Sequence, residues 1–199
     1  PPPPPPLGTT RTKGPFTDAA GRPFVFPGIT GIVFDRTTPG SLLVATPTAI
    51  YRLSAANVAT ILAGTEGEDG DRDGPGTTAR FHTIRSLALR SDGSLLYVAD
   101  MGNHKIRRVV VATGAVTTVA GSGRQGAADG VGAAAQFRNP DGLILSSDDR
   151  TLYVADQGNH KIRRVVVATG AVSVLAGSGQ RGDADGVGAA AQFYYPRGL

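Results

Sequence analysis

The sequence predicts an all-β fold made of a repeated unit of four short strands, and three observations lead to this prediction. The first is an internal repeat with a period of 56 residues, because the run GNHKIRRVVVATGAV that begins at Gly102 returns letter for letter at Gly158. The second is that each repeat contains short Val- and Ile-rich runs separated by Gly and Asp turns, which favour strands. The third is the content of 28 glycines in 199 residues, which is about twice the usual share and indicates many turns.

Several copies of the repeat can be followed along the chain. The run Tyr97–Asp100 returns as Tyr153–Asp156 with the same period of 56 residues. A degenerate copy precedes these two, since Phe81 lies 56 residues before Phe137. Residues 193–199 match the start of the preceding copy and open another unit. A fixed period of this length is the signature of a repeat architecture.

The third copy shows the predicted strands most clearly, at residues 142–146, 152–155, 161–167 and 172–176. Four strands in one unit are typical of a propeller blade. Apolar runs such as residues 109–111 fit a blade that is packed on both faces by its neighbours. A leucine-rich solenoid would need a period of about 20–29 residues and does not fit. The sequence therefore predicts a β-propeller array.

The pattern FRNPDGLIL…TLYVADQGNHKIRRV, which begins at Phe137, resembles the NHL repeat. The connector AGSGQRGDADGVGAAAQF resembles an extended version of that repeat. The resemblance is strong over residues 81–199 and weak over residues 26–80, where Val-Ala-Thr at residues 44–46 replaces Tyr-Val-Ala-Asp and the Asn-His pair is missing. It implies a propeller, usually of about six blades, that serves mostly as a binding platform.

The chain is expected to divide into a proline-rich lead-in or linker at residues 1–25 and a propeller segment at residues 26–199. The predicted blades cover about residues 26–80, 81–136 and 137–192, with the start of the next blade at residues 193–199. This amounts to about three and a half blades, whereas closed rings have roughly 4–8. We therefore expect the sequence to be an excerpt of a longer chain. The missing blades would come from an unseen continuation, from a neighbouring subunit or from a stacking that is not a ring.

Composition and charge restrict the classes of function. Cys is absent, which excludes disulfides and thiolate metal sites. The net charge of +4 favours anionic partners without requiring nucleic acid. Basic stripes lie on the predicted third strands, and they lack interleaved aromatic residues for base stacking. We therefore expect a solvated strand surface paired with loop acids and no nucleic-acid partner. The stripes consist of Lys105, Arg107 and Arg108 and of Lys161, Arg163 and Arg164. No apolar run reaches the roughly 20 residues of a membrane helix, so no membrane span is expected.

Loops at one face of the array are the candidate binding surface. In a four-stranded meander, the connection between the second and third strands lies on the same face as the connector to the next unit. Long loops on a rigid scaffold are where binding usually occurs. The candidate binding residues in these loops are Asp100, Asn103, His104, Asp129, Asp156, Asn159, His160 and Asp185.

A structural interpretation of the same residues is also open, and their recurrence in each good copy favours it. Asp and Asn side chains hold tight loops by bonding backbone N–H groups. Asp73, Asp129 and Asp185 would be N-caps of short helical turns, and each turn would end at a buried Phe.

No catalytic residue, metal site or cofactor is predicted. The expected innermost strands, IRSLAL and GLILSS, carry no Glu or His, and the three histidines lack zinc-ligand spacing. No nucleophile elbow and no phosphate-binding loop is present. The favoured function is therefore non-enzymatic binding or assembly. The alternatives are a propeller lyase or lactonase whose active residues lie in blades outside this sequence, and an RNA-binding NHL domain.

The N-terminal residues predict a polyproline II rod. Hexaproline beside threonine resembles the Pro-rich stalks of extracellular and cell-wall proteins. We therefore expect an extracellular or cell-surface location, with protein or glycan partners; the alternative is a plain linker between domains. The predicted O-glycosylation or hydroxyproline segment consists of Pro1, Pro2, Pro3, Pro4, Pro5, Pro6, Thr9 and Thr10.

Self-association is the last expectation from the sequence. An incomplete array leaves blade faces in water, and leaving buried-type apolar surface exposed is unfavourable by about 25 cal/mol per Å². Copies that join head to tail would make a heterologous contact, which produces rings or filaments.

Overall fold

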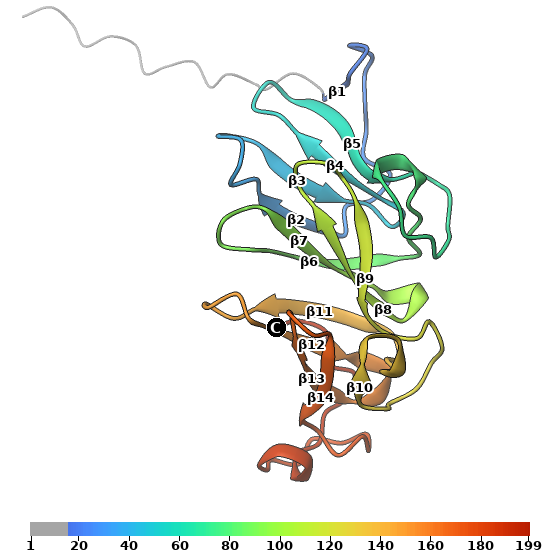
Figure 1. The fold of residues 1–199 in the computed structure, drawn as a ribbon, viewed down its shortest axis with the longest axis vertical. Coiled ribbons are helices and arrows are strands. Elements are labelled where there is room, and N and C mark those ends of the chain that lie inside the picture. The colour runs from blue at the N-terminus through green and yellow to red at the C-terminus, as the bar shows by residue number, and fades with distance from the viewer. Residues whose placement is uncertain (1–15) are drawn as a thin grey trace, which may run out of the picture.

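The structure is a computed structural model that describes residues 16–199, and it arranges them as three β-sheets stacked along one axis (Figure 1). Each sheet contains four strands that are neighbours in chain order, as in a propeller blade, and two of the sheets carry a short fifth strand at the outer edge. The prediction of an all-β propeller segment is confirmed. The predicted modification segment, from Pro1 to Pro6 with Thr9 and Thr10, lies outside the described residues.

Each sheet corresponds to one copy of the repeat. Blade 1 consists of β2 (Gly31–Phe34), β3 (Leu42–Ala45), β4 (Ala49–Leu53) and β5 (Val58–Gly64). Blade 2 consists of β6 (Ile84–Leu89), β7 (Leu95–Asp100), β8 (Lys105–Val110) and β9 (Val116–Ala120). Blade 3 consists of β11 (Pro140–Leu145), β12 (Thr151–Asp156), β13 (Lys161–Val166) and β14 (Ala171–Ala176).

The connector that precedes each blade pairs with the outermost strand of that same blade. The strand β1 (Thr17–Asp18) pairs in parallel with β5, and β10 (Gly130–Val131) pairs antiparallel with β14. In blade 2 the same role falls to an isolated bridge between Gly74 and Val116. Residues 130–131 therefore pair with the blade that follows the predicted unit 81–136. Residues 16–25 of the predicted lead-in include β1, and Phe24 packs against blade 1.

The helical content of residues 16–199 is limited to turns of three residues. The turns η1 (Gly76–Thr78), η3 (Gly132–Ala134) and η5 (Gly188–Ala190) lie in the connectors, and η2 (Met101–Asn103) and η4 (Gln157–Asn159) lie between the second and third strands. No helix in this part of the chain is long and apolar enough to cross a membrane.

The core lies between the sheets. We call the face of a blade that is turned toward the next blade its front face, and the opposite face its back face. One layer joins the front face of blade 1 to the back face of blade 2, and the next joins blade 2 to blade 3 in the same way. Phe81 and Phe137, one from each connector, are fully buried in these two layers, as the repeat predicted.

The repeat allows a direct comparison between a covered and an uncovered blade face. Tyr97 and Ile106 lie on the front face of blade 2, where blade 3 covers them and leaves both fully buried. Their counterparts in the next copy, Tyr153 and Ile162, are partly exposed because no described residue covers the front face of blade 3 in the same way. The same residue types therefore have different environments in consecutive blades.

This comparison predicts unequal effects of truncating the connector phenylalanines. Phe137→Ala should lower the free energy of unfolding by about 3–5 kcal/mol, because it removes a fully buried ring from the layer between two blades. Phe193→Ala should cost clearly less, because its ring is only partly buried. Urea unfolding of both variants measures the difference. Equal losses would show that the two positions are packed alike.

Candidate functional site

The loops between the second and third strands lie between two connectors. In blade 2 the backbone N–H of Gly102 donates to the carbonyl of His82 over 2.7 Å, and Asn103 Nδ2 donates to the carbonyl of Gly70 over 2.6 Å. On the other side, His104 Nδ1 accepts a hydrogen bond from the backbone N–H of Asn139. The loop and the connectors on either side therefore share one face, as the meander required.

Asp100 is fully buried at the start of this loop, and both of its carboxylate oxygens are bonded. One oxygen accepts from the backbone N–H of His82 over 2.9 Å. The other accepts from Asn103 Nδ2 over 2.9 Å and from Arg107 Nη1 over 2.8 Å. We call this arrangement the Asp–Asn–Arg clamp.

The clamp recurs in blade 3 with nearly the same geometry. Asp156 accepts from the backbone N–H of Arg138 over 2.8 Å, from Asn159 Nδ2 over 2.8 Å and from Arg163 Nη1 over 2.9 Å. Asn159 Nδ2 also donates to the carbonyl of Gly126 over 2.6 Å. The bonds of the clamp thus reach back into the preceding connector instead of staying within the tight loop.

The two clamp arginines are fully buried, so the prediction that Arg107 and Arg163 lie on a solvated strand surface is wrong. The predicted pairing with loop acids is present. Strand alternation explains the burial, because Arg107 shares the back face of its blade with the core residue Val109. Arg107 Nη2 also bonds the carboxylate of Asp73 over 2.5 Å. The guanidinium carbon lies 5.4 Å from the centroid of the Phe81 ring.

The connector acids bind these arginines and do not cap helical turns. Asp129 bonds Arg163 Nη2 over 2.7 Å, in the same way that Asp73 bonds Arg107. The N-cap positions of the turns are Pro75, Val131 and Val187, without a side-chain capping bond, so the predicted N-cap role is wrong. Asp185 is exposed, and no arginine pairs with it within residues 16–199.

Burial raises the pKa of Asp100 to about 6, while the bonds from Asn103, the His82 N–H and Arg107 act in the opposite direction. Burial likewise raises the pKa of Asp156. Both carboxylates pair with a buried guanidinium group, and donors from the chain itself fill their bonding positions. The geometry therefore supports the structural interpretation of these residues, and within the described part of the chain no cluster of His, Asp and Glu could hold a metal ion.

The two loop histidines join each blade to the connector that follows it. His104 and His160 both have a left-handed backbone with a φ of 55°. His160 Nδ1 accepts from the backbone N–H of Tyr195 over 3.2 Å, which is the counterpart of the bond from Asn139 to His104. Burial lowers the pKa of His104, which keeps its ring neutral and its Nδ1 able to accept.

Blade 1 replaces the clamp with a different set of side chains. On the third strand of blade 1, Tyr51 pairs with Val44 of the second strand. In blade 2 the equivalent pair is Arg107 and Val98, so Tyr51 takes the place of the arginine. The Tyr51 hydroxyl donates to Glu66 over 3.0 Å, and Thr46 donates to the same carboxylate oxygen over 2.6 Å. The back face of blade 1 is therefore held by one acid without a buried arginine.

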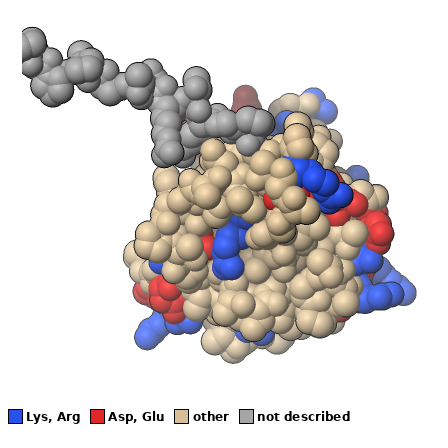
Figure 2. All heavy atoms as spheres, turned by 90° about the horizontal axis from the view of Figure 1, so that it is seen from above, with Lys and Arg blue, Asp and Glu red and all other residues tan. Residues whose placement is uncertain are grey.

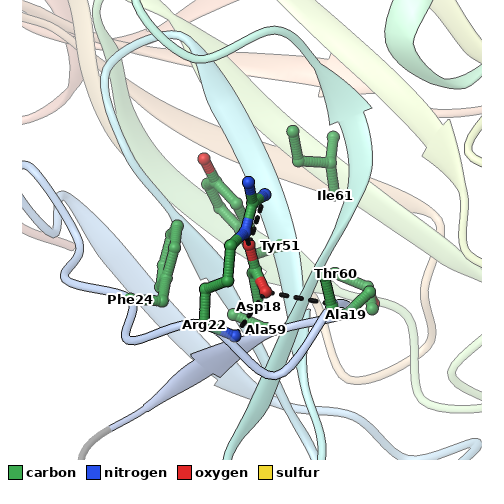
Figure 3. Close-up of a pocket in the computed structure, with 9 residues that line it drawn as sticks. Asp18, Ala19, Arg22, Phe24, Tyr51, Ala59, Thr60 and Ile61 are labelled. Atoms are coloured by element: carbon green, nitrogen blue, oxygen red, sulfur yellow. Dashed lines mark hydrogen bonds and ion pairs between the residues drawn. The ribbon is translucent and has the colours of Figure 1, made fainter.

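A hollow of about 530 Å³ lies on this back face, between β1, β4 and β5 (Figure 3). Its floor contains Tyr51 and Phe24, whose ring centroids are 5.3 Å apart. Asp18 accepts from the backbone N–H and the side chain of Arg22, so this ion pair is closed on itself. The hollow offers an apolar floor and no free charged group aimed into it.

The buried arginines were missed in the sequence because burial of a charge requires a partner that is distant in the chain. Arg107 and Asp73 are separated by 34 residues. A signal existed, since the acid and the arginine recur together in both good copies and the arginine alternates with core valines. Reading those positions as a pair would have indicated the clamp.

The clamp predicts strong coupling between its members. Asp100→Ala should lower the free energy of unfolding by about 3–5 kcal/mol, because it leaves a fully buried arginine without its buried partner. Arg107→Met added to that variant should restore part of the loss, because no unpaired buried charge then remains. Urea unfolding of the two single variants and the double variant measures the coupling, and strictly additive losses would contradict it.

The His104 link predicts a pH dependence. Because the folded state lowers the pKa of His104, its contribution to stability is full above the unfolded value of about 6.5 and is lost as the pH falls through that value toward the folded one. His104→Asn, which tolerates the left-handed backbone, should remove this dependence. The stability of the parent relative to the variant should therefore fall between about pH 7 and pH 5. Urea unfolding at each pH would show a constant difference if the link were absent.

Comparison with protein-family models gives no match. Among curated proteins, NHL repeat-containing protein 2 of Bos taurus is 39% identical over 109 residues, which are 53% of this chain and 15% of that protein. The same protein of Homo sapiens is 37% identical over 107 residues. Protein SUPPRESSOR OF QUENCHING 1, chloroplastic, of Arabidopsis thaliana is 30% identical over 126 residues, which are 62% of this chain and 12% of that protein. The chain thus spans 15% or less of the length of these relatives.

Solved structures show the same fold. A protein of unknown function from Bacteroides thetaiotaomicron has a TM-score of 0.68 at 21% identity and covers 85% of this chain and 41% of its own. An auxiliary nutrient binding protein from the same organism has a TM-score of 0.54 at 21% identity, over 85% of this chain and 53% of its own. A chain of a Nidogen/Laminin complex has a TM-score of 0.53 at 15% identity, over 74% of this chain and 48% of its own.

The 56-residue repeat, the four-stranded blades and the likeness to NHL repeat-containing proteins lead to one conclusion. The described residues form part of a β-propeller whose repeats are similar to those of NHL repeat-containing proteins.

Proposed function

We propose that this chain is a non-enzymatic binding and assembly module that uses the front face of blade 3 to bind a second copy. The observation that carries the proposal is the uncovered apolar surface of that face. Ile144 and Leu175 are each 46% exposed there. Ala88, the counterpart of Ile144 in blade 2, is only 9% exposed because blade 3 covers it.

The back face of blade 1 is the surface that fits this front face. Ile32 is 53% exposed and Phe34 is 78% exposed on its inner strand β2. The corresponding inner strands of blades 2 and 3 place Leu87 and Leu143 against the preceding blade, where both are buried. Figure 2 looks onto the blade 1 end of the stack, where most of the visible surface is uncharged. Charged side chains lie around the rim, and a basic group lies near the middle of the face. Joining the two faces would repeat the contact between blades 2 and 3.

One constraint applies to such a contact. Each layer between blades holds one connector phenylalanine, which is Phe137 in the layer between blades 2 and 3. Phe26 packs on the back face of blade 1 with its ring centroid 5.4 Å from that of Tyr51, just as Phe137 packs beneath Arg163. Phe193 is the next member of this series. In head-to-tail joining, Phe26 would take the place that Phe193 holds on blade 3. The segment that begins at Phe193 would therefore have to leave blade 3, and the partial exposure of Phe193 favours that release.

Other proteins of this fold support binding as a role. The solved structures of similar fold include an auxiliary nutrient binding protein and a chain of a Nidogen/Laminin complex. An extracellular or cell-surface location, a glycan partner and growth into filaments are part of the proposal. Their support is the composition of residues 1–10 and the heterologous geometry of the two faces.

The mass of the chain in solution tests this proposal. Light scattering over a range of concentrations should show association of the 199-residue chain. Ile144→Asp should weaken association at least about tenfold, because it places a charge in the apolar contact. Ser147→Asp, at an exposed turn of the same blade, is the matched control and should leave association unchanged. A monodisperse monomer with a cooperative melt at all concentrations would overturn the proposal.

A further inference from the structure

The loop face of blade 3 contains a basic pocket with a volume of about 480 Å³. Its walls are the connection at residues 158–161 and the connector at residues 178–181, with Ala127 and Arg138 beside them. The cations at this pocket are Arg138, Lys161 and Arg181. Within residues 16–199, none of these three forms an ion pair.

Blade 2 has the same loops with a different charge balance. There Lys105, the counterpart of Lys161, donates to both carboxylate oxygens of Asp71 over 2.6 and 2.7 Å. The residue 56 positions after Asp71 is Ala127, so blade 3 lacks this carboxylate. A second acid of blade 2, Asp69, lies 4.0 Å from His82 and is replaced by Gln125 in blade 3. Blade 3 has therefore lost two acids, and it has gained Arg138 in place of His82.

The carboxylate of Asp71 shows where an anion would lie in blade 3. It lies 3.5 Å from the position that a Cβ on Gly123 would occupy, with Lys105 Nζ at 3.7 Å from the same point. Around the counterpart Gly179, Lys161 Nζ lies at 3.6 Å and no carboxylate is among the nearest atoms. The ammonium group is thus held in the same place in both blades, and in blade 3 the position of its anion is open.

The remaining cations are held by contacts with the loops. The aliphatic part of Arg138 packs directly against Gly158, and a side chain in place of this glycine would collide with Arg138. The guanidinium carbon of Arg181 lies 4.3 Å from the centroid of the Tyr194 ring. Ordering these long side chains beforehand lowers the entropy cost of binding. Three positive groups around one pocket can take more than one carboxylate.

We propose that this pocket binds an acidic peptide segment of a partner protein, with Lys161 taking a carboxylate in the place that Asp71 fills in blade 2. The ligand chemistry follows from the internal comparison, because the chain itself supplies a carboxylate at the equivalent point of blade 2. The pocket lies on the loops and not on the front face, and its central contact is made by Lys161. Only the contact between Arg181 and Tyr194 involves the segment that head-to-tail joining would release.

The test uses fluorescein-labelled hexaglutamate and fluorescence anisotropy on the whole chain. The parent should bind the peptide at one site, with an affinity that falls as salt rises. Ala127→Asp gives blade 3 the acid that blade 2 already carries and should weaken binding at least about tenfold. Ile144→Asp should leave peptide binding unchanged whatever it does to association. The thermal melt of each variant should match that of the parent, which shows that the fold is kept.

Removing the corresponding acid from blade 2 tests the proposal more strictly. Asp71→Ala frees Lys105 and should create a second, weaker site, so the stoichiometry measured by titration should rise from one peptide per chain to two. The proposal is overturned if the parent does not bind hexaglutamate, if Ala127→Asp binds it as tightly as the parent, or if Asp71→Ala adds no site. Single-stranded RNA of matched length is the other probe. RNA that binds more tightly than the peptide and is lost in Ala127→Asp would reassign the pocket to a phosphate backbone.

Discussion

The buried ion pair between Arg107 and Asp100 is the interaction on which the arrangement of each regular blade depends. Both side chains are fully buried, and removing two charges from water is costly unless each is paired and hydrogen-bonded. Here the required partners come from three segments: the connector, the loop after the second strand and the third strand. Those segments must stay together for the charges to stay satisfied. The ion pair therefore holds the loops of this face in fixed positions relative to one another, and the walls of the basic pocket of blade 3 are formed by such loops.

Blade 1 shows what changes when the arginine is absent. Tyr51 and Glu66 satisfy each other with Thr46, and no charge from the connector is needed. The connector acid Asp18 forms its ion pair with Arg22 of the same connector instead. The connector of blade 1 is thus held by aromatic packing of Phe24 and Phe26 and by a short parallel pairing. Among residues 16–199, no ion pair joins this connector to the blade, so the back face of blade 1 is the less constrained end of the stack.

The sequence was sufficient for the fold and insufficient for the site. Period, strands and the buried Phe137 could be predicted because identical letters recur at a fixed spacing. The burial of Arg107 could not, because a basic strand residue is usually solvated and its acids lie in another part of the unit. The contrast between Asp71 and Ala127 is visible once the copies are aligned. The effect of this difference follows only from the structure, in which the Asp71 carboxylate accepts hydrogen bonds from Lys105.

The pairing of each connector with the blade that follows it has a consequence for how such arrays change in length. A segment such as residues 121–176 carries Asp129, Asp156 and Arg163 together, so duplicating or deleting it leaves every neighbouring clamp intact. A segment cut at residue 137 would instead pair the added arginine with the acid of the preceding copy, Asp185 in place of Asp129. Recombination that begins at the connector therefore changes the copy number and keeps each acid with its own arginine. Fifteen identical residues in adjacent copies are the expected trace of such an event.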